Sequence, residues 1–109
     1  MRSANLDSAD LSKSYLAKVD LWEANLQSAD LSSSTLDGAN LWEANLSNAD
    51  IRNASLVKTH LFMANLRGAD LSGANLDSAL LRDTNLQNAL FCSASGENGK
   101  MDIKNKTLS

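Results

Sequence analysis

A large apolar residue occupies every fifth position of the chain from Leu6 to Phe91, which makes 18 consecutive positions without an insertion. All of them are Leu except Ile51 and Phe91. A small residue stands two positions earlier, Ala in 13 of the 18 cases, and Asn or Asp stands one position earlier in 12 of them. The repeating unit therefore reads Ala-(Asn or Asp)-Leu-x-x, with its last two positions mostly polar.

A period of five fits neither a regular helix nor a straight strand. In an α-helix five residues advance by about 500°, so the leucines would spread around the circumference without forming a buried stripe. In a straight strand an odd step places successive leucines on opposite faces. We therefore predict a chain that bends once in every five residues, so that each Leu and each small residue points towards one axis.

A second period of twenty residues indicates how many bends complete one coil. Leu-Trp-Glu-Ala-Asn occurs at 21–25 and again at 41–45, and Leu-Phe-Met-Ala-Asn follows at 61–65. Four units of five therefore form one coil with a roughly square section. Stacked at the parallel-strand spacing of about 4.8 Å, residues 3–93 would form about four and a half coils and a rod roughly 20–24 Å long.

These units resemble those of the pentapeptide repeat proteins, a family whose members form a right-handed quadrilateral parallel β-helix. The resemblance covers residues 3–93. It implies an all-β solenoid in which the large apolar and the small residue face inward. We expect a β-helix over residues 1–93 and a C-terminal tail over 94–109 that is either a cap or disordered. A fold hosts sites without defining them, so the resemblance implies little about activity.

Composition narrows the class of protein further. The chain has 109 residues, the length of one domain, and Leu and Ala supply 34 of its 47 hydrophobic residues. A single Cys and a net charge of −3 exclude a disulfide scaffold and a strongly basic nucleic-acid binder. No apolar run is long enough to span a membrane. The first residues lack the apolar segment of a secretory signal, so we expect a cytoplasmic protein.

Inward hydroxyls and outward amides carry two structural expectations. Thr59 and Thr84 stand at inward positions, where a buried hydroxyl requires a hydrogen-bond partner. Asn and Asp before each Leu suit the bends, because their side chains can accept from nearby backbone N–H groups. Asn also recurs at 5, 25, 45, 65 and 85, which predicts an amide ladder along one face.

An aromatic column is the first candidate binding site. Trp22, Trp42 and Phe62 follow inward leucines at intervals of twenty, so they should face solvent one coil apart. Arg82 stands on the next rung and could lie over Phe62 as a cation–π contact. The column either covers backbone or contacts another protein, and exposed Trp favours the second interpretation because Trp is enriched at interface hot spots.

An aspartate column is the second candidate. Asp10, Asp30, Asp50 and Asp70 should lie about 5 Å apart along one face, ending at Leu90. Such carboxylates either cap turns or trap a cation. The family resemblance implies one more function, because some quinolone-resistance members resemble a DNA duplex and bind type II topoisomerases as decoys. Residues 1–93 carry 11 acidic and 7 basic side chains, a balance of −4, but basic residues interrupt the acidic surface and no loop is inserted.

The C-terminal coils carry extra apolar residues. Leu80 and Leu90 replace the usual Asn or Asp beside the inward Leu81 and Phe91. Each end of a β-helix exposes a strand edge and an open core that must be covered. Either the tail folds back over Leu86 and Phe91, or a second copy docks there as a homodimer, an arrangement known in the family.

Catalysis finds little support in the sequence. His60 is the only histidine, and Cys92 has no second Cys or neighbouring His. A general base needs a partner and a pocket, and a rod filled with Leu offers neither. We therefore predict no enzyme activity and no cofactor or metal. The expected partner is another protein, without direct nucleic-acid or membrane binding.

Overall fold

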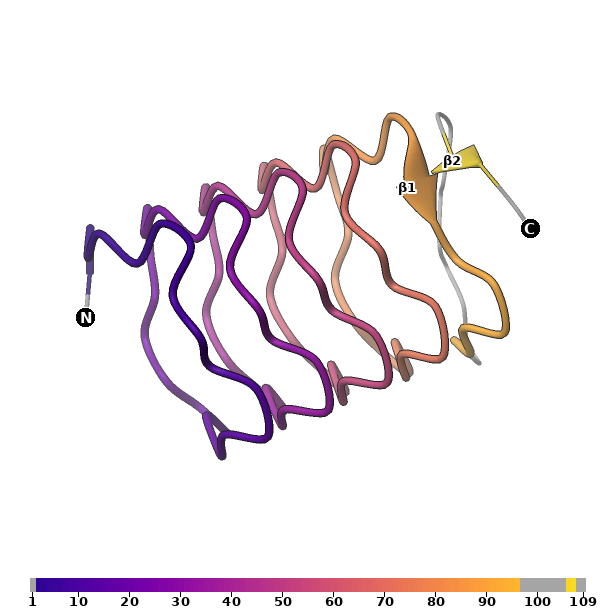
Figure 1. Cartoon of the computed structure of the whole chain (residues 1–109), viewed down its shortest axis with the longest axis horizontal. Helices are drawn as coiled ribbons and strands as arrows, with labels where there is room; N and C mark the ends of the chain where they lie inside the picture. Colours follow the sequence, from indigo (N-terminus) through magenta and orange to yellow (C-terminus); the bar gives the residue numbers. More distant parts are fainter. Residues whose placement is uncertain (1, 97–105, 108–109) are drawn as a thin grey trace.

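The computed structural model describes residues 2–96 and 106–107, which form a solenoid of stacked coils (Figure 1). Fifteen parallel β-bridges join residues twenty positions apart, beginning with Asn5↔Asn25 and ending with Asn75↔Ser95. The twenty-residue period therefore corresponds to one coil. Apart from Ser95, each bridged residue stands directly before an inward apolar residue, where the chain is briefly extended.

Every five-residue unit contains a tight turn. The N–H of the small residue donates to the carbonyl of the preceding Leu, as Ala24 does to Leu21 at 3.0 Å. The third residue of each turn has φ between 56° and 74°, in 16 non-glycine residues and in Gly38, Gly68 and Gly73. This left-handed φ at the third position is the geometry of a type II turn. The chain therefore bends by backbone torsion, not only by side-chain capping.

Backbone hydrogen bonds join the coils. The N–H of Leu26 donates to the carbonyl of Asn45 at 2.7 Å, and the N–H of Asn45 donates back to Ala24 at 2.9 Å. The same pattern repeats at nearly every unit of residues 2–96. Because the backbone is satisfied between coils, the interior needs no polar groups.

The interior consists of Leu and Ala layers, as the five-residue period predicts. Twelve large side chains from Leu21 to Leu76 are almost fully buried, whereas Leu6, Leu11 and Leu16 of the first coil are only partly covered. The inward hydroxyls have the predicted partners. Thr59 Oγ1 donates to the Leu36 carbonyl at 2.8 Å, and Thr84 Oγ1 donates to the Leu61 carbonyl at 2.6 Å.

Two short strands pair at the C-terminal end. Strand β1 (Ala89–Leu90) runs parallel to strand β2 (Lys106–Thr107), with Ala89 opposite Lys106 and Leu90 opposite Thr107. Figure 1 shows β2 beside β1 at the end of the solenoid. Two residues of the tail thus occupy part of the last strand edge. The rest of the predicted tail, 97–105 and 108–109, lies outside the described residues.

The four predicted C-terminal contact residues divide into two pairs. Leu80 and Leu90 are 41% and 37% exposed, as expected for outward positions. Leu86 and Phe91 are buried core residues. A docking surface on the side of this end would therefore consist of Leu80 and Leu90, whereas Leu86 and Phe91 belong to the end of the core.

Candidate functional site

The aromatic column contains five rungs. Successive coils place Arg2, Trp22, Trp42, Phe62 and Arg82 at one outward position of the twenty-residue period, so an arginine stands at each end of three aromatic rings. Arg2 belongs to the same twenty-residue column, but the recurring pentads do not reveal it because they begin only at residue 21. The twenty-residue period, extended back from Trp22, identifies Arg2 as a member of the column.

Most neighbouring rungs are in contact. The Cζ atom of Arg2 lies 5.2 Å from the Trp22 ring centroid, and that of Arg82 lies 5.8 Å from the Phe62 centroid. The latter is the cation–π contact that the sequence predicts. Trp42 and Phe62 pack edge to face, with centroids 5.4 Å apart and an interplanar angle of 87°. Such pairs contribute about 0.5–1.5 kcal/mol beyond their buried area.

The three rings point outward, as predicted for this column, but they differ in exposure. Trp42 is 41% exposed, whereas Trp22 and Phe62 are half-buried. The guanidinium groups of Arg2 and Arg82 lie over the two outer rings, and this contact accounts for the difference. Trp42 is thus the most accessible ring of the column.

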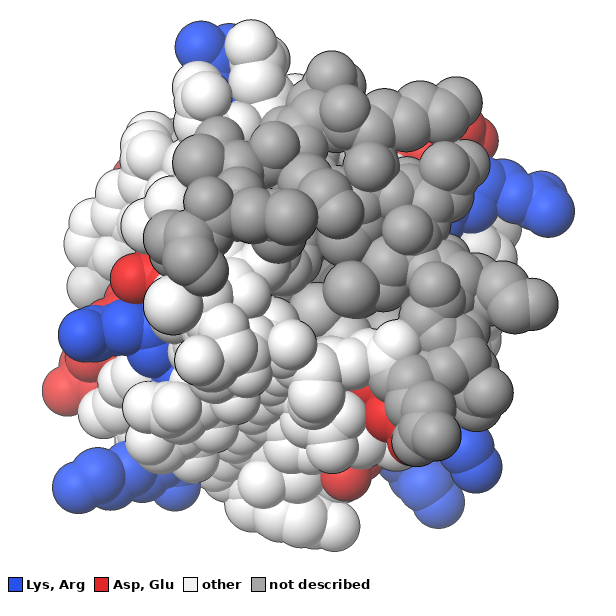
Figure 2. Space-filling view, turned by 90° about the vertical axis from the view of Figure 1, so that its right-hand side faces the viewer, with Lys and Arg blue, Asp and Glu red and all other residues white. Residues whose placement is uncertain are grey.

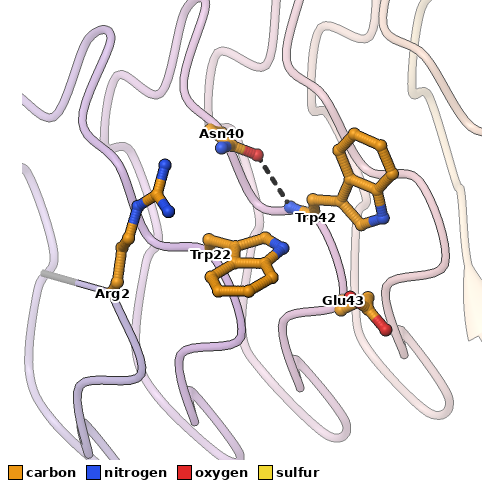
Figure 3. A pocket seen from close by; sticks show the side chains of 5 residues that line it. All are labelled: Arg2, Trp22, Asn40, Trp42 and Glu43. Carbon is orange, nitrogen blue, oxygen red and sulfur yellow. Dashed lines mark hydrogen bonds between the residues drawn. The ribbon is translucent and has the colours of Figure 1, made fainter.

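A shallow surface hollow of about 360 Å³ lies along the two indoles. It is lined by Arg2, Trp22, Asn40, Trp42 and Glu43. Figure 3 shows Trp22 between Arg2 and Trp42, with Asn40 and Glu43 on opposite sides of the two indoles. The volume lies near the lower limit for small-ligand sites, so the hollow suits one side chain better than a large cofactor.

Side-chain caps fix the backbone under both indoles. Asp20 Oδ1 accepts from the Trp22 N–H at 3.2 Å, and Asn40 Oδ1 accepts from the Trp42 N–H at 3.1 Å. The Asn40 amide also donates to Asp20 Oδ1 at 3.3 Å. The main chain that carries the two indoles is therefore held by hydrogen bonds to Asp20 and Asn40.

The charge of Arg2 is compensated locally. Its Nε donates to Asp20 Oδ2 at 2.6 Å, and both side chains remain partly exposed. This hydrogen bond is the main reason that the pKa of Asp20 lies below its ordinary value. Arg2 and Asp20 thus form a neutral pair at one end of the hollow.

The aspartate column caps turns. Asp10, Asp30, Asp50 and Asp70 bridge in register, and each Oδ1 accepts from the N–H two residues later at 3.0–3.1 Å. Serine hydroxyls add a second bond at Asp10 and Asp30, of 2.7 and 2.6 Å. This geometry corresponds to the capping interpretation of the sequence, since the same carboxylates hold the bends.

Local donors also offset the like charges of this column. The hydrogen bond from the Ser12 hydroxyl lowers the pKa of Asp10, and Arg52 lowers the pKa of Asp50 by donating to its carboxylate at 2.8 and 2.7 Å. Within residues 2–96 and 106–107, no cluster of three His, Cys, Asp or Glu side chains is arranged to hold a metal ion.

The asparagines of the predicted amide ladder are paired through their main chains and not through their side chains. Asn5, Asn25, Asn45, Asn65 and Asn85 are bridged in register. Each side-chain oxygen, however, accepts from the N–H two residues later, as at Asn45 with 3.0 Å. In the part of the chain that the structure describes, these amides do not bond to one another, because the turn uses their oxygens.

The remaining reactive residues lie apart from each other. His60 packs near Phe62, with ring centroids 6.2 Å apart, and Cys92 is an exposed free thiol. Among the described residues, His60 makes no hydrogen bond to a carboxylate, so the side-chain pairing of a general base is not found there.

Seen from the C-terminal end, charges of both signs lie around the rim (Figure 2). Lys and Arg side chains project at several corners, and Asp and Glu lie between them.

A parallel solenoid with a twenty-residue coil and one turn in every five residues defines a repeat protein whose outward columns present its sites. The profile of the Pentapeptide repeats matches eight copies, over residues 4–42, 24–61 and 60–95. The chain belongs to the pentapeptide repeat family.

Solved structures agree with this assignment. A pentapeptide repeat protein, Rfr23, from the cyanobacterium Cyanothece 51142 is 32% identical, with a TM-score of 0.80 over 93% of this chain and 65% of that chain. A pentapeptide repeat protein of the Arabidopsis thaliana thylakoid lumen is 28% identical, with a TM-score of 0.70 over 84% of this chain and 61% of the other. This chain thus spans less than two thirds of either protein.

QnrB1, a plasmid-mediated fluoroquinolone resistance protein, is similar in fold alone, at 17% identity and a TM-score of 0.55 over 99% of this chain and 78% of that chain. No curated protein matches the chain significantly in sequence. Within the described residues, no helix is long and apolar enough to cross a lipid bilayer.

Proposed function

We propose that the chain is a non-catalytic interaction module that binds another protein through the aromatic column. The observation that carries this proposal is the exposure of Trp42 beside a hollow that Trp22 also lines. Large aromatic side chains left accessible on a rigid surface are typical of binding hot spots. The Leu and Ala core and the backbone ladder fix this surface before a partner arrives.

Affinity capture with three variants tests the proposal. The wild-type chain, the double variant Trp22→Ser/Trp42→Ser and the control Tyr15→Ser are used as baits in the same extract. Tyr15 is an exposed aromatic residue in a different column, so its substitution controls for non-specific binding to exposed aromatic side chains. Proteins that bind wild type and Tyr15→Ser but not the double variant support the proposal. Equal capture by all three baits contradicts it.

Topoisomerase binding by DNA mimicry is the second candidate function, on the acidic balance of residues 1–93 and the Asp column. Arg52, Arg67 and Arg82, which interrupt the acidic residues along the chain, weigh against it. A gyrase supercoiling assay tests it directly. If the chain inhibits gyrase or protects it from a quinolone, and Asp30→Asn/Asp70→Asn loses this effect, topoisomerase binding is favoured over partner binding through the aromatic column.

We also infer the finer architecture and setting of the chain. Its similarity to pentapeptide repeat proteins supports a right-handed, four-sided coil, with about four and a half coils in a β-helix over residues 1–93 and a cap within 94–109. We expect a cytoplasmic protein, with Leu80 and Leu90 available to a second copy. Size-exclusion chromatography of Leu80→Ser/Leu90→Ser against wild type tests the homodimer.

A further inference from the structure

The aromatic column is interrupted once. Arg2 packs on Trp22, and Trp42, Phe62 and Arg82 pack in sequence, but Trp22 and Trp42 form no ring contact with each other among the described residues. The hollow lies at this interruption. These two indoles stand on neighbouring rungs but do not pack against each other, and neither has an aromatic partner on that side.

A carboxylate stands at the same place. Glu43 lines the hollow and is exposed, and it forms no ion pair or side-chain hydrogen bond within the described part of the chain. Arg2, the one cation among the lining residues of the hollow, is already paired with Asp20. Two indoles and one unpaired carboxylate therefore make the hollow attractive to a cation, since both ring faces and carboxylate carry negative potential.

We propose that this hollow binds an arginine side chain of a partner protein, between Trp22 and Trp42 with its guanidinium paired to Glu43. This inference rests on the proposed function and names the chemistry that the aromatic column recognises. The chain itself contains the same arrangement, since Arg2 lies over Trp22 and pairs with Asp20. The bound arginine would make the same two kinds of contact, with an indole and with a carboxylate, although Glu43 lies on the other side of the indoles from Asn40, the residue one coil after Asp20.

Arginine fits the hollow better than other cations. Its planar guanidinium stacks on an indole and can donate two hydrogen bonds to one carboxylate, whereas the lysine ammonium is a compact and strongly hydrated charge. A quaternary ammonium has no N–H to donate to Glu43. The hollow is also open to solvent, as one residue of an approaching protein chain requires, and not a closed cage for a free small molecule.

The two indoles allow a direct test, because Trp22 and Trp42 are the only tryptophans of the chain. Their indole N–H signals are followed by 1H–15N NMR while the peptide acetyl-Gly-Arg-Gly-Arg-Gly-amide is added. The same peptide with citrulline, which keeps the shape and removes the charge, and with lysine are the comparison probes. We expect shifts with the arginine peptide, several-fold weaker binding of the lysine peptide, and no shift with citrulline.

Two matched variants test whether the carboxylate of Glu43 binds the guanidinium. Glu23 and Glu43 occupy identical pentads, but only Glu43 lines the hollow. Glu43→Gln should lower the affinity for the arginine peptide about tenfold, because one charge-assisted pair is lost. Glu23→Gln should leave this affinity unchanged. Both residues are exposed, and a circular dichroism melt checks that each variant folds.

Two results would overturn the inference: equal shifts with citrulline, or equal losses in Glu23→Gln and Glu43→Gln. The proposed function is judged separately. If Glu43→Gln captures partners as wild type does while Trp22→Ser/Trp42→Ser captures none, the arginine inference fails and the aromatic column remains a binding site. If the double Trp variant captures everything that wild type does, the proposed function itself fails.

Discussion

Gly68 and Gly38 share a backbone geometry but differ in what lies above them. Their φ angles are 71° and 68°, both at the third position of a turn. A Cβ on Gly68 would overlap the side-chain oxygen of Asn48, one coil earlier, whereas a Cβ on Gly38 would meet only Lys18 Cγ at 3.4 Å. Alanine at each position therefore separates the cost of the torsion from the cost of the contact between coils.

The two costs can be estimated. A left-handed φ costs an L-residue about 1 kcal/mol, which the chain already sustains at 16 other positions. Gly38→Ala should lose about that much stability. Gly68→Ala should lose about 2 kcal/mol, because Asn48 must also leave its preferred rotamer at a cost of about 0.5–1.5 kcal/mol. Asn48→Ser should remove this second part, and Ser28 shows that the column accepts serine.

A double-mutant cycle measures the contact. Urea unfolding of wild type, Gly68→Ala, Asn48→Ser and the double variant should give a coupling energy of about 1 kcal/mol between positions 48 and 68. Circular dichroism and Trp fluorescence should give the same midpoint, because a solenoid can lose two-state behaviour. If Gly68→Ala costs the same in both backgrounds, or no more than Gly38→Ala, the reasoning is refuted.

Three more substitutions test the core, the inward hydroxyls and the carboxylate column. Leu46→Ala removes a buried side chain and should cost about 2–5 kcal/mol in urea unfolding. Thr59→Val removes the bond to the Leu36 carbonyl and should cost about 1 kcal/mol in the same assay. Arg52→Gln should raise the pKa of Asp50 towards its ordinary value in a 13C NMR titration. Because the pKa of Asp50 is lowered in the folded chain, its stabilising effect is present above the unfolded pKa of about 3.9 and is lost as the pH falls through the folded pKa.

Each substitution has a matched control. Leu80→Ala shortens an exposed leucine and should cost well under 1 kcal/mol, and a cost equal to that of Leu46→Ala would contradict the inward assignment. Thr59→Ser keeps the hydroxyl and should retain its hydrogen bond. Arg67→Gln removes an exposed arginine from another column, and a rise in the pKa of Asp50 in that variant would argue against a local effect.

Hydrophobic periodicity was sufficient to predict the coil and its interior. The five-residue and twenty-residue periods depend only on which side chains must be buried, and burial dominates the energetics of folding. Leu26, Ala29 and Leu31 accordingly face inward, and Asn25 pairs with Asn45. The inward threonines were equally predictable, because a buried hydroxyl has few ways to be satisfied.

The left-handed turn residue could not be read from any single unit. Ser, Lys, Glu, Asn, Asp and Met occupy that position, and none of these types identifies a positive φ alone. The signal lies in the set of positions. All three glycines before residue 96 stand there, and no Val, Ile or Thr does, because β-branched residues are disfavoured in this region.

The aromatic column shows why the binding surface was harder to predict than the core. Residues 21–25 and 41–45 have identical sequences and the same turn, yet Trp22 is half-buried and Trp42 is 41% exposed. The difference must come from residues one coil away: Arg2 lies over one ring and Phe62 packs against the other. Outward side chains contribute little to the Leu and Ala core, so a column can change while the coil stays the same. The specificity of such a protein therefore depends on residues twenty positions apart, and the proposed arginine site lies where two neighbouring rungs of the column do not pack against each other.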